Sequence, residues 1–550
     1  MAVIRLRLMN KRFTASLIGL ISGFSMLFLI VSEKVVPPWD PTSMMLLGQS
    51  LVQRQSLQYF DAHNSEIAPY FNPHGFNIRV PSDAQPYSTF PPGFSLVLAV
   101  VYTFTGSLDW MYFIPPTLTV VGLAASAYLG YILSGSWGSL FAVLLLGCSH
   151  VVAAFATSLW SDGPSLDLLL VGMALSIWAV RSNRKSAALG AGLCWGLFIL
   201  FKFVNMMFVI LIVVGIVIFW KDGMRRVIWW LLPGLVGGVA GMLLYQAIAY
   251  GGPLANAYQP WGRSLYDFPL FSPTYLFFKS PYPWNDLSNN AILSGISTDM
   301  QLWAGVFVIA LVIDRRNPLR LLLALIVMAN VTLYAVSVFS PRQFINMRYL
   351  LPALAAAYIL VADVLARTMK RLSVPIVRLG LIGLVSAICL RNLLVTVLPD
   401  LTNRNAGTSH TIQMVKETSR SLPPNTVVLA YSLADSFILY GNLSTLNYRR
   451  VSAPDINTRN ALVMHAIDKM ICQGQPVYLV KDDESLFNSI YPDLAHSYVL
   501  RTQSTPIITY EIQLKDSDQR CAASATGAAA GSRKLNPAFE MRELPLGSPS

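Results

Sequence analysis

Residues 187–220 read AALGAGLCWGLFILFKFVNMMFVILIVVGIVIFW, an apolar stretch of 34 residues in which Lys202 is the single charge. A helix needs about 20 apolar residues to cross a bilayer, so this stretch is one overlong helix or two short ones joined near Lys202 and Asn205. Basic residues flank it on both sides: Arg181, Arg184 and Lys185 before it, and Lys221, Arg225 and Arg226 after it. Because cytoplasmic loops collect Lys and Arg, both flanks lie inside only if the chain crosses twice. We therefore predict two short spans with an outer turn at Lys202.

The composition extends this conclusion to the whole chain. Of its 550 residues, 54% are hydrophobic and 12% are charged, whereas about a quarter of a soluble globular chain is charged. These values exclude a disordered chain, a disulfide scaffold and a coiled coil, and they indicate an integral membrane protein. A net charge of +12 would suggest a nucleic-acid partner in a soluble protein. In a membrane protein, loop charges that set the orientation explain it instead, and we expect no nucleic acid.

Eleven apolar segments are predicted to span the membrane. They are residues 14–32, 110–133, 138–157, 164–180, 186–201, 203–220, 227–250, 300–313, 319–338, 349–366 and 375–397. Residues 94–104, which follow Pro91-Pro92-Gly93, are apolar but too few to span, so we expect an interfacial or re-entrant helix there.

The charges orient these spans. Seventeen basic residues then fall in short cytoplasmic segments: Arg5, Arg7, Lys11, Arg12, Arg181, Arg184, Lys185, Lys221, Arg225, Arg226, Arg315, Arg316, Arg320, Arg367, Lys370, Arg371 and Arg378. The longer outer segments hold eight: Lys34, Arg54, Arg79, Lys202, Arg263, Lys279, Arg342 and Arg348. The N-terminus is therefore predicted to be cytoplasmic, and the chain beyond about residue 397 lies outside.

The outer face is predicted to hold two long loops, 33–109 and 251–299, and a C-terminal part of different character. Strands expected at 427–430, 476–481 and 507–514, with a helix at 459–472, predict a small α/β domain over 398–515. Residues 516–550, rich in Ala, Gly, Ser and Pro, are expected to be a disordered tail. The five cysteines are expected to be unpaired, although Cys472 and Cys521 could bridge in an oxidising compartment. The predicted fold is a polytopic α-helical membrane domain, residues 1–397, followed by an extracytoplasmic α/β domain.

Two acids stand at the predicted outer boundary. Asp40, in Pro37-Pro38-Trp39-Asp40-Pro41, follows the first span, and Asp162 lies in the short loop before the helix that starts near Pro164. An apolar wall desolvates a carboxylate, which can raise its basicity enough to take a proton from a hydroxyl. Both acids also suit helix caps. Asp167, inside a span, must find a partner because a carboxylate is costly there.

Cations and aromatic residues share that boundary. Lys202, Arg342 and Arg348 could bind a phosphate, or they could anchor lipid headgroups. The aromatic residues of loop 251–299, among them Tyr258 and Trp261, suit an aromatic belt or a surface for sugar rings and isoprenoid chains. His63 and His74 lack metal-site spacing and are expected to be structural or solvent-exposed.

These residues resemble the GT-C superfamily of membrane glycosyltransferases, in the branch of protein O-mannosyltransferases and aminoarabinose transferases. The resemblance covers about residues 14–400. It is carried by Asp40, Tyr87-Ser-Thr-Phe-Pro-Pro-Gly-Phe94, Trp160-Ser-Asp162, Lys202 and Arg348-Tyr-Leu-Leu-Pro352. Many relatives have a second acid directly after the first, whereas here Pro41 follows Asp40.

The resemblance implies transfer of a sugar from a polyprenyl-phosphate carrier to a glycan, lipid or protein acceptor on the outer face, with inversion. Asp40 and Asp162 would be the catalytic acids, Lys202, Arg348 and Arg342 would bind the donor phosphate, and Tyr87, Tyr258, Trp261 and Tyr349 would contact acceptor or lipid. If a divalent metal takes part, Asp40 and Asp162 would hold it. We expect a bacterial plasma membrane.

A polytopic transporter or lipid-linked sugar flippase is the main alternative, and a non-catalytic glycan-binding subunit is another. A transporter should carry ionisable residues near mid-membrane and paired repeats with broken helices. The predicted spans are nearly free of charge and the acids gather at the outer boundary, which favours the enzyme.

Overall fold

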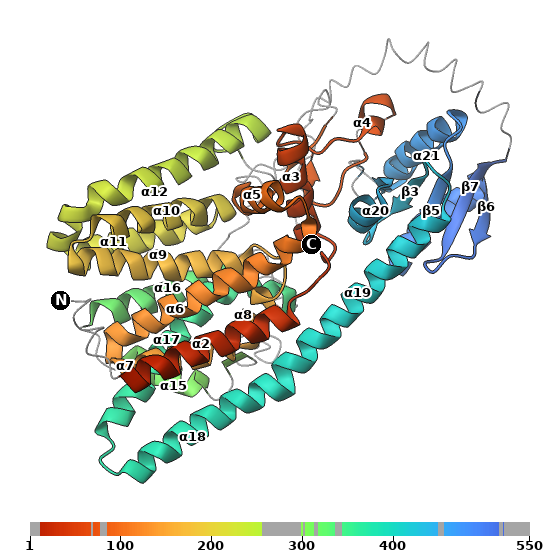
Figure 1. The fold of residues 1–550 in the computed structure, drawn as a ribbon. Coiled ribbons are helices and arrows are strands. Elements are labelled where there is room, and N and C mark those ends of the chain that lie inside the picture. Colours follow the sequence, from red (N-terminus) through yellow and green to blue (C-terminus); the bar gives the residue numbers. More distant parts are fainter. Residues whose placement is uncertain are drawn as a thin grey trace, which may run out of the picture. The chain divides into compact units, whose positions relative to one another are not determined.

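The computed structural model of the chain describes residues 11–67, 70–77, 85–255, 299–300, 303–312, 317–335, 344–448, 451, 456–515 and 521 (Figure 1). The chain divides into two compact units. The helical unit comprises residues 1–60 and 72–414, and the tail unit comprises residues 61–71 and 415–550. The predicted disordered tail, 516–550, lies outside the described residues apart from Cys521.

The described part of the helical unit consists of helices and one two-stranded ribbon. The elements up to residue 182 are α2 (Lys11–Val31), α3 (Asp40–Arg54), β1 (Phe76–Asn77), β2 (Tyr87–Ser88), α5 (Gly93–Thr105), η1 (Leu108–Phe113), α6 (Ile114–Ser134), α7 (Ser136–Gly147), α8 (His150–Ala156) and α9 (Asp162–Ser182). Those that follow are α10 (Lys185–Phe201), α11 (Asn205–Phe219), α12 (Lys221–Tyr250), α15 (Trp303–Val312), α16 (Pro318–Ala335), η3 (Phe344–Leu350), α17 (Leu351–Arg371), α18 (Pro375–Asn392), η4 (Leu393–Val397) and α19 (Leu398–Ser421).

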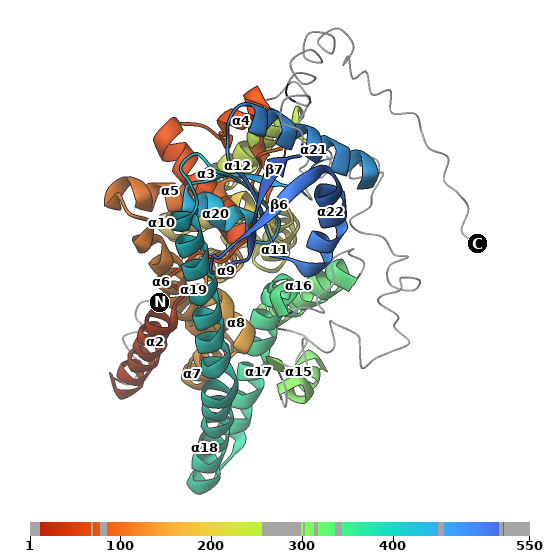
Figure 2. The same cartoon turned by 90° about the vertical axis from the view of Figure 1, so that its right-hand side faces the viewer.

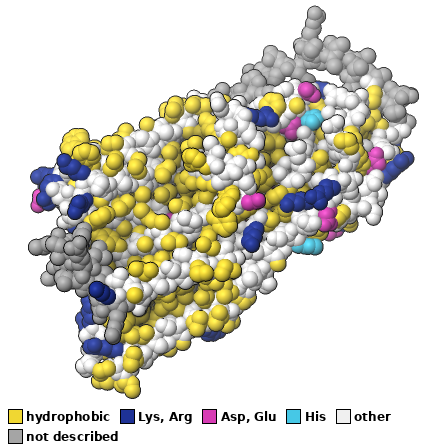
Figure 3. All heavy atoms as spheres, in the orientation of Figure 1, with side chains coloured by type: hydrophobic (Ala, Val, Ile, Leu, Met, Phe, Trp, Pro, Cys, Tyr) yellow, Lys and Arg dark blue, Asp and Glu magenta, His cyan; other side chains and the backbone are white. Residues whose placement is uncertain are grey.

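The described residues of each predicted span fall on a helix or on consecutive helices. Within the part of the chain that the structure describes, six helical segments are long and apolar enough to cross a membrane, or seven if the bent pair α7 and α8 forms one span. Helices α5, α10, α11 and α16 are apolar but shorter. The protein is therefore an integral membrane protein, and the count of eleven spans stays a prediction. Figure 3 shows hydrophobic side chains over much of this unit's visible face and Lys and Arg at the end where α12 begins.

The stretch 187–220 forms two helices, as predicted. Helix α10 ends at Phe201 and α11 begins at Asn205. The Asn205 side chain donates to the carbonyl of Phe198 over 2.6 Å and to Ser165 Oγ over 2.9 Å. A helix end leaves its last carbonyls without partners, so the Asn205 amide stabilises the break that leaves Lys202 between the helices.

Helices α10 and α12 pack through glycines. Gly192 and Gly196 of α10 face Gly234 and Gly238 of α12, and a Cβ on any of the four would overlap the facing backbone. Small residues four apart let transmembrane helices approach closely. This contact holds α10 in place, and with it the turn that carries Lys202.

Asp167 and Arg320, two charged residues buried inside the bundle, have polar partners. Asp167 of α9 accepts a hydrogen bond from Thr119 Oγ1 over 3.0 Å. Arg320 is buried and pairs with Asp363 of α17 at 3.0 Å, although the sequence placed it among the cytoplasmic loop charges. This pair joins α16 to α17 within the bundle.

The helix that contains the last predicted span, 375–397, continues beyond residue 397. Helix α18 continues through the π-helical turn η4 into α19, so that residues 375–421 form one long helical segment. The predicted α/β part therefore follows a helix that runs to Ser421.

The tail unit is built on a five-stranded sheet. Its elements are α4 (Ala62–Glu66), β3 (Val427–Ala430), α20 (Ala434–Gly441), β4 (Ser444–Asn447), α21 (Ile456–Cys472), β5 (Val477–Val480), α22 (Glu484–Ser497), β6 (Tyr498–Gln503) and β7 (Thr509–Leu514). The order is β4-β3-β5-β7-β6, with β4, β3 and β5 parallel and β7 antiparallel to β5 and β6. Strands β3, β5 and β7 lie where the sequence predicted strands.

Two features of the tail unit differ from the main expectation. Cys472 and Cys521 form a disulfide with Cα atoms 5.4 Å apart, so the expectation that all five cysteines are unpaired is wrong. Residues 61–71 of the first loop also belong to this unit, with Phe71 buried in its core. Asn64 fixes this segment by exchanging hydrogen bonds with the backbone of Phe71 at 2.8 and 3.2 Å.

Candidate active site

Four predicted residues from distant parts of the sequence meet in one cluster of the helical unit. Asp40 and Asp162 are the first residues of α3 and α9, Lys202 lies between α10 and α11, and Arg348 lies in η3. Arg348 Nη1 is 2.9 Å from Asp40 Oδ2, and Lys202 Nζ pairs with Asp162 Oδ1. Both acids lie at helix N-termini, but each carboxylate faces a cation, which supports a role beyond helix capping.

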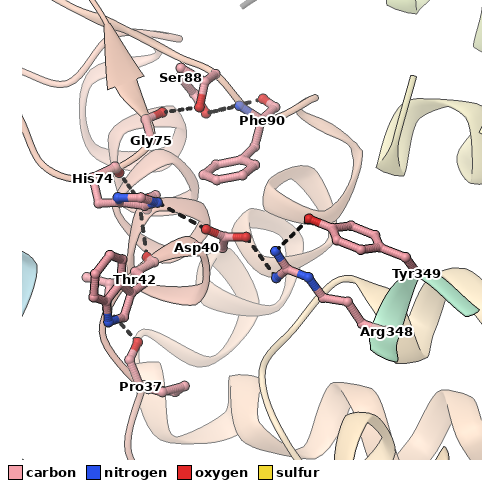
Figure 4. Close-up of polar contacts among 12 residues, drawn as sticks. Pro37, Asp40, Thr42, His74, Gly75, Ser88, Phe90, Arg348 and Tyr349 are labelled. Carbon is pink, nitrogen blue, oxygen red and sulfur yellow. Dashed lines mark hydrogen bonds and ion pairs between the residues drawn. The ribbon is translucent and has the colours of Figure 1, made fainter. Parts of the chain in front are cut away.

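The backbone positions Asp40. Trp39 has φ 84° and ψ −137°, a conformation that costs an L-residue of order 1–3 kcal/mol and turns the chain sharply into α3. Pro41 then occupies the first turn of the helix, where its missing N–H has no cost. Figure 4 shows the result: the Asp40 carboxylate lies between His74 on one side and Arg348 on the other.

His74 is a part of this cluster that the sequence analysis missed. Its Nε2 is 3.1 Å from Asp40 Oδ1, and its ring lies edge-on to Trp39 with centroids 5.2 Å apart. Ser43 Oγ donates to the His74 carbonyl. In the sequence, His74 is a single histidine beside Gly75 in a loop. Nothing in that pattern indicates that it contacts Asp40, 34 residues earlier.

Aromatic rings hold Arg348. Its guanidinium carbon lies 4.3 Å from the ring centroid of Trp160 and 4.9 Å from that of Tyr349. Its Nη2 donates to the Tyr349 hydroxyl over 3.0 Å, and Tyr349 stacks on Tyr334 with centroids 5.0 Å apart. The planar group is thus fixed on two sides, as a site for bidentate anion binding requires.

A small, partly open pocket adjoins the cluster. It is bounded by the ends of α9, α11, α16 and α17, and its lining combines cations, an acid, amides and apolar side chains. The lining residues are Asp162, Ser165, Leu166, Lys202, Asn205, Phe208, Asn330, Tyr334, Arg348, Tyr349, Leu351 and Pro352. Two cations at a pocket with apolar walls suit an amphiphile with an anionic head.

The electrostatics of Asp40 differ from the expectation. Burial by itself would raise the pKa of Asp40. The charge of Arg348, the hydrogen bond and charge of His74, and the charge of Lys202 outweigh this effect and lower the pKa from 3.8 to about 2. The predicted gain in basicity from the apolar wall is therefore wrong for this state of the site. Burial lowers the pKa of Lys202, Asp162 opposes that shift, and Arg348 reinforces it.

The remaining predicted site residues have different outcomes. Tyr349 lies in the cluster. Tyr87, in β2, packs against Tyr245, Ala249 and Tyr250. Arg342, Tyr258 and Trp261 lie outside the described residues.

The donor set fits a metal ion poorly. Asp40 and Asp162 each face a cation, and within the described ranges no three His, Cys, Asp or Glu side chains are grouped to hold a metal. The reaction proposed below uses no metal ion.

The helix termini around the site are closely packed. Gly93, at the start of the predicted interfacial helix α5, lies against α10 so closely that a Cβ would come within 2.6 Å of the Leu200 backbone. Phe94 packs edge-on against Phe201, with ring centroids 5.5 Å apart. Helix α5 thus supports the end of α10 beside Lys202, while its outer residues Val100 and Phe104 stay exposed.

Comparison with known proteins gives similarity at the level of structure. No protein-family model matches the sequence, and no curated protein sequence matches it. ArnT from Cupriavidus metallidurans, solved with undecaprenyl phosphate, superposes with a TM-score of 0.56 at 14% identity, over 91% of this chain and 98% of that one.

Two further structures are similar. The oligosaccharyltransferase AglB from Archaeoglobus fulgidus, solved with an inhibitory peptide and a dolichol-phosphate, has a TM-score of 0.54 at 10% identity, over 91% of this chain and 74% of that one. The mycobacterial arabinofuranosyltransferase AftD has a TM-score of 0.52 at 14% identity, over 93% of this chain but 42% of its own. The chain therefore has the fold of the GT-C superfamily of membrane glycosyltransferases.

Proposed function

We propose that this protein is a glycosyltransferase that moves a sugar from a polyprenyl-phosphate carrier to an acceptor on the outer face of the membrane. One observation carries the proposal: Asp40, Asp162, Lys202 and Arg348 meet beside a partly open pocket at helix ends in a membrane protein. The solved relatives that share the fold include one bound to undecaprenyl phosphate and one bound to dolichol-phosphate.

Lys202 and Arg348 are proposed to bind the donor phosphate. Both line the pocket, and both are held by neighbouring side chains, so that little reorganisation is needed when charge develops on the departing phosphate. Fixed positive groups stabilise such charge better than mobile water does. Asp162 would position Lys202 through their ion pair. Arg342 is proposed as a further phosphate contact on its sequence position alone.

Asp40 is proposed to be the general base for the acceptor hydroxyl. With a pKa of about 2 it is ionised but weakly basic, because Arg348, His74 and Lys202 stabilise its charged form. A bound donor phosphate offsets the positive charges of Arg348 and Lys202 and so raises the pKa of Asp40. Donor binding would thereby activate the base.

The bond changes follow from these roles. The acceptor oxygen loses its proton to Asp40 and attacks the anomeric carbon, while the bond from that carbon to the phosphate oxygen breaks. Arg348 and Lys202 take up the charge on the leaving polyprenyl phosphate. A single displacement of this kind inverts the anomeric configuration.

The predicted orientation supports an outer-face reaction. Basic residues gather in the segments assigned to the cytoplasm, which leaves the four charged site residues at the outer ends of their helices. The disulfide of Cys472 and Cys521 agrees with a tail unit outside the cytoplasm, because disulfides persist in oxidising compartments. We infer a cytoplasmic N-terminus and a plasma membrane of bacterial type. Neither the sugar nor the acceptor class is assigned.

The deciding experiment measures transfer directly. Purified protein is given a radiolabelled polyprenyl-phosphate sugar and a crude acceptor extract, and wild type is compared with Asp40→Asn. Loss of the base is expected to lower the rate by about 10²–10⁴-fold. Asp109→Asn, at an exposed outer-loop acid, is the matched control and should keep full activity. Undiminished transfer in Asp40→Asn would refute the assignment, and counterflow of the lipid without transfer would favour a flippase.

A further inference from the structure

The carboxyl edge of the parallel strands in the tail unit forms a switch point. From β3 the chain passes through α20 to β4 on one side, whereas from β5 it passes through α22 to β6 on the other side. Strands β3 and β5 are neighbours, so the chain leaves their carboxyl ends in opposite directions. In the view of Figure 2, the two connecting helices α20 and α22 appear on either side of β6 and β7. In open α/β sheets a crevice opens at such a point and commonly holds a ligand.

Asp482, just after β5, lies at this carboxyl edge of the sheet. Its Oδ2 accepts hydrogen bonds from the backbone N–H groups of Tyr431 and Leu433, at 2.9 and 2.8 Å. These N–H groups lie after β3, where α20 begins, and such groups usually bind a phosphate in this kind of fold. A side-chain carboxylate already takes that position, so the crevice is not built for an anion.

Two polar atoms beside this contact are left without partners. Among the described residues, neither Asp482 Oδ1 nor the hydroxyl of Tyr448 has a hydrogen-bond partner, and Tyr448 is only 2% exposed. A buried polar group without a partner costs about 1–3 kcal/mol. A ligand hydroxyl would satisfy both, since it can donate to the carboxylate and accept from the phenol.

The surroundings favour a neutral ligand with an apolar face. The negative charges of Asp482 and Asp483 and the positive charge of Arg459 all act on Tyr448, so the electrostatic environment is mixed in sign. Burial raises the pKa of Asp482, and the backbone N–H groups of Leu433, Tyr431 and Asp482 itself oppose that shift. The rings of Tyr431 and Tyr448 lie 6.4 Å apart at 51° and offer aromatic surface beside these polar atoms.

We propose that the carboxyl edge of β3, β4 and β5 in the tail unit binds a neutral saccharide, with Asp482 and Tyr448 as its hydrogen-bonding residues and Tyr431 as an aromatic contact. Sugars combine hydroxyls with apolar C–H faces, which matches this set of side chains. The site lies wholly within the tail unit and is distinct from the charged cluster of the helical unit. The inference goes beyond the proposed function and does not require transfer activity.

Saccharide binding by the full-length protein in nanodiscs tests this inference. Saturation-transfer NMR is run without donor, in the Asp40→Asn background, with neutral disaccharides of glucose, mannose, galactose and arabinose. At least one should bind, and Tyr448→Phe and Asp482→Asn should each weaken it about tenfold or more. Tyr478→Phe, a buried tyrosine in the middle of β5, is the matched control and should bind like the parent.

The outcomes separate this inference from the proposed function. Tyr448→Phe should leave the melting temperature unchanged or raised, because it removes a hydroxyl without a partner, so weaker binding cannot be ascribed to unfolding. Equal binding in both variants, no binding of any neutral saccharide, or preference for glucosamine or inorganic phosphate would overturn the inference. Asp40-dependent transfer with Tyr448-independent binding would refute this inference alone, and the reverse pattern would refute the proposed function alone.

Discussion

Asp40 and Arg348 are 308 residues apart in the sequence, yet their side chains lie 2.9 Å apart. In this arrangement each acid of the site is matched to a cation, so the substrate-free cluster of Asp40, Asp162, Lys202 and Arg348 is close to neutral. An arriving phosphate then gains two cations that are already in place. We therefore expect a substitution that keeps the charge of a site residue but changes its shape to lower the activity.

Arg348→Lys tests that geometry. Lysine keeps the charge but loses the planar fork that contacts Asp40, Tyr349 and the Trp160 ring. We expect kcat/KM for the polyprenyl-phosphate donor to fall by about 10–100-fold, measured by initial rates over a range of donor concentrations. Arg404→Lys, in the half-buried Asp400–Arg404 pair of α19, should change little. Wild-type kinetics in Arg348→Lys would show that charge alone suffices.

His74→Phe tests the pH dependence of the base. His74 lowers the pKa of Asp40 through a hydrogen bond and its charge, so its removal should raise that pKa from about 2 toward 3.8. A base works only when ionised, so activity is present above the pKa and is lost as the pH falls through it. The acid limb of kcat/KM should thus move to higher pH. The control is His410→Phe, at an exposed histidine of α19. An unmoved limb would contradict the coupling.

At the scale of elements, the site depends on where helices end. Helix α10 stops at Phe201 because the Asn205 amide takes over the Phe198 carbonyl, and α5 presses on that end through Gly93. The glycines between α10 and α12 set the distance between these helices. A substitution in the contact between α10 and α12 should therefore displace α10 and, with it, Lys202.

Gly234→Ala tests this transmission. Its Cβ would overlap the backbone of Gly192, so the helices must separate, at a cost of about 1–3 kcal/mol. Thermal unfolding in detergent should show a lower midpoint, and transfer activity should fall with it. Gly237→Ala, on the same helix with open space around its Cβ, should be neutral or slightly stabilising. Equal midpoints for the two variants would exclude the close packing as a determinant.

At the scale of the whole molecule, one long helical segment joins two kinds of structure. Residues 375–421 begin as an apolar helix and continue as α19 into the tail unit, and residues 61–71 of the first loop join that unit as well. The disulfide closes between Cys472 and a residue near the end of the described chain. The predicted odd number of spans places the N-terminus and the tail unit on opposite sides of the membrane. An oxidising location for the tail unit therefore goes with a cytoplasmic N-terminus.

Cysteine labelling tests that orientation. In a background with Cys148, Cys194 and Cys389 replaced by alanine, Asn457→Cys in the tail unit should react with a membrane-impermeant maleimide in intact cells. Asn183→Cys, between α9 and α10, should react only after permeabilisation. Both positions are exposed, so access decides the result. The opposite pattern would invert the topology.

The sequence by itself determined the membrane class, the helical segments and the break at Lys202, and its resemblance to the GT-C superfamily predicted the fold. Hydrophobic length and loop charge are local properties, so they can be read from consecutive residues. The same reasoning proposed Asp40, Asp162, Lys202 and Arg348 as a group, because each stands at a helix end on one predicted face.

Only the tertiary structure decided which groups are in contact. It pairs Asp40 with Arg348, adds His74, and lowers the pKa of Asp40 where its apolar setting alone predicted the reverse. It also closes the disulfide, buries Arg320 against Asp363 and brings residues 61–71 to the tail unit. Pairing and pKa depend on separations of a few ångströms between residues tens to hundreds of positions apart, and no local pattern encodes those separations.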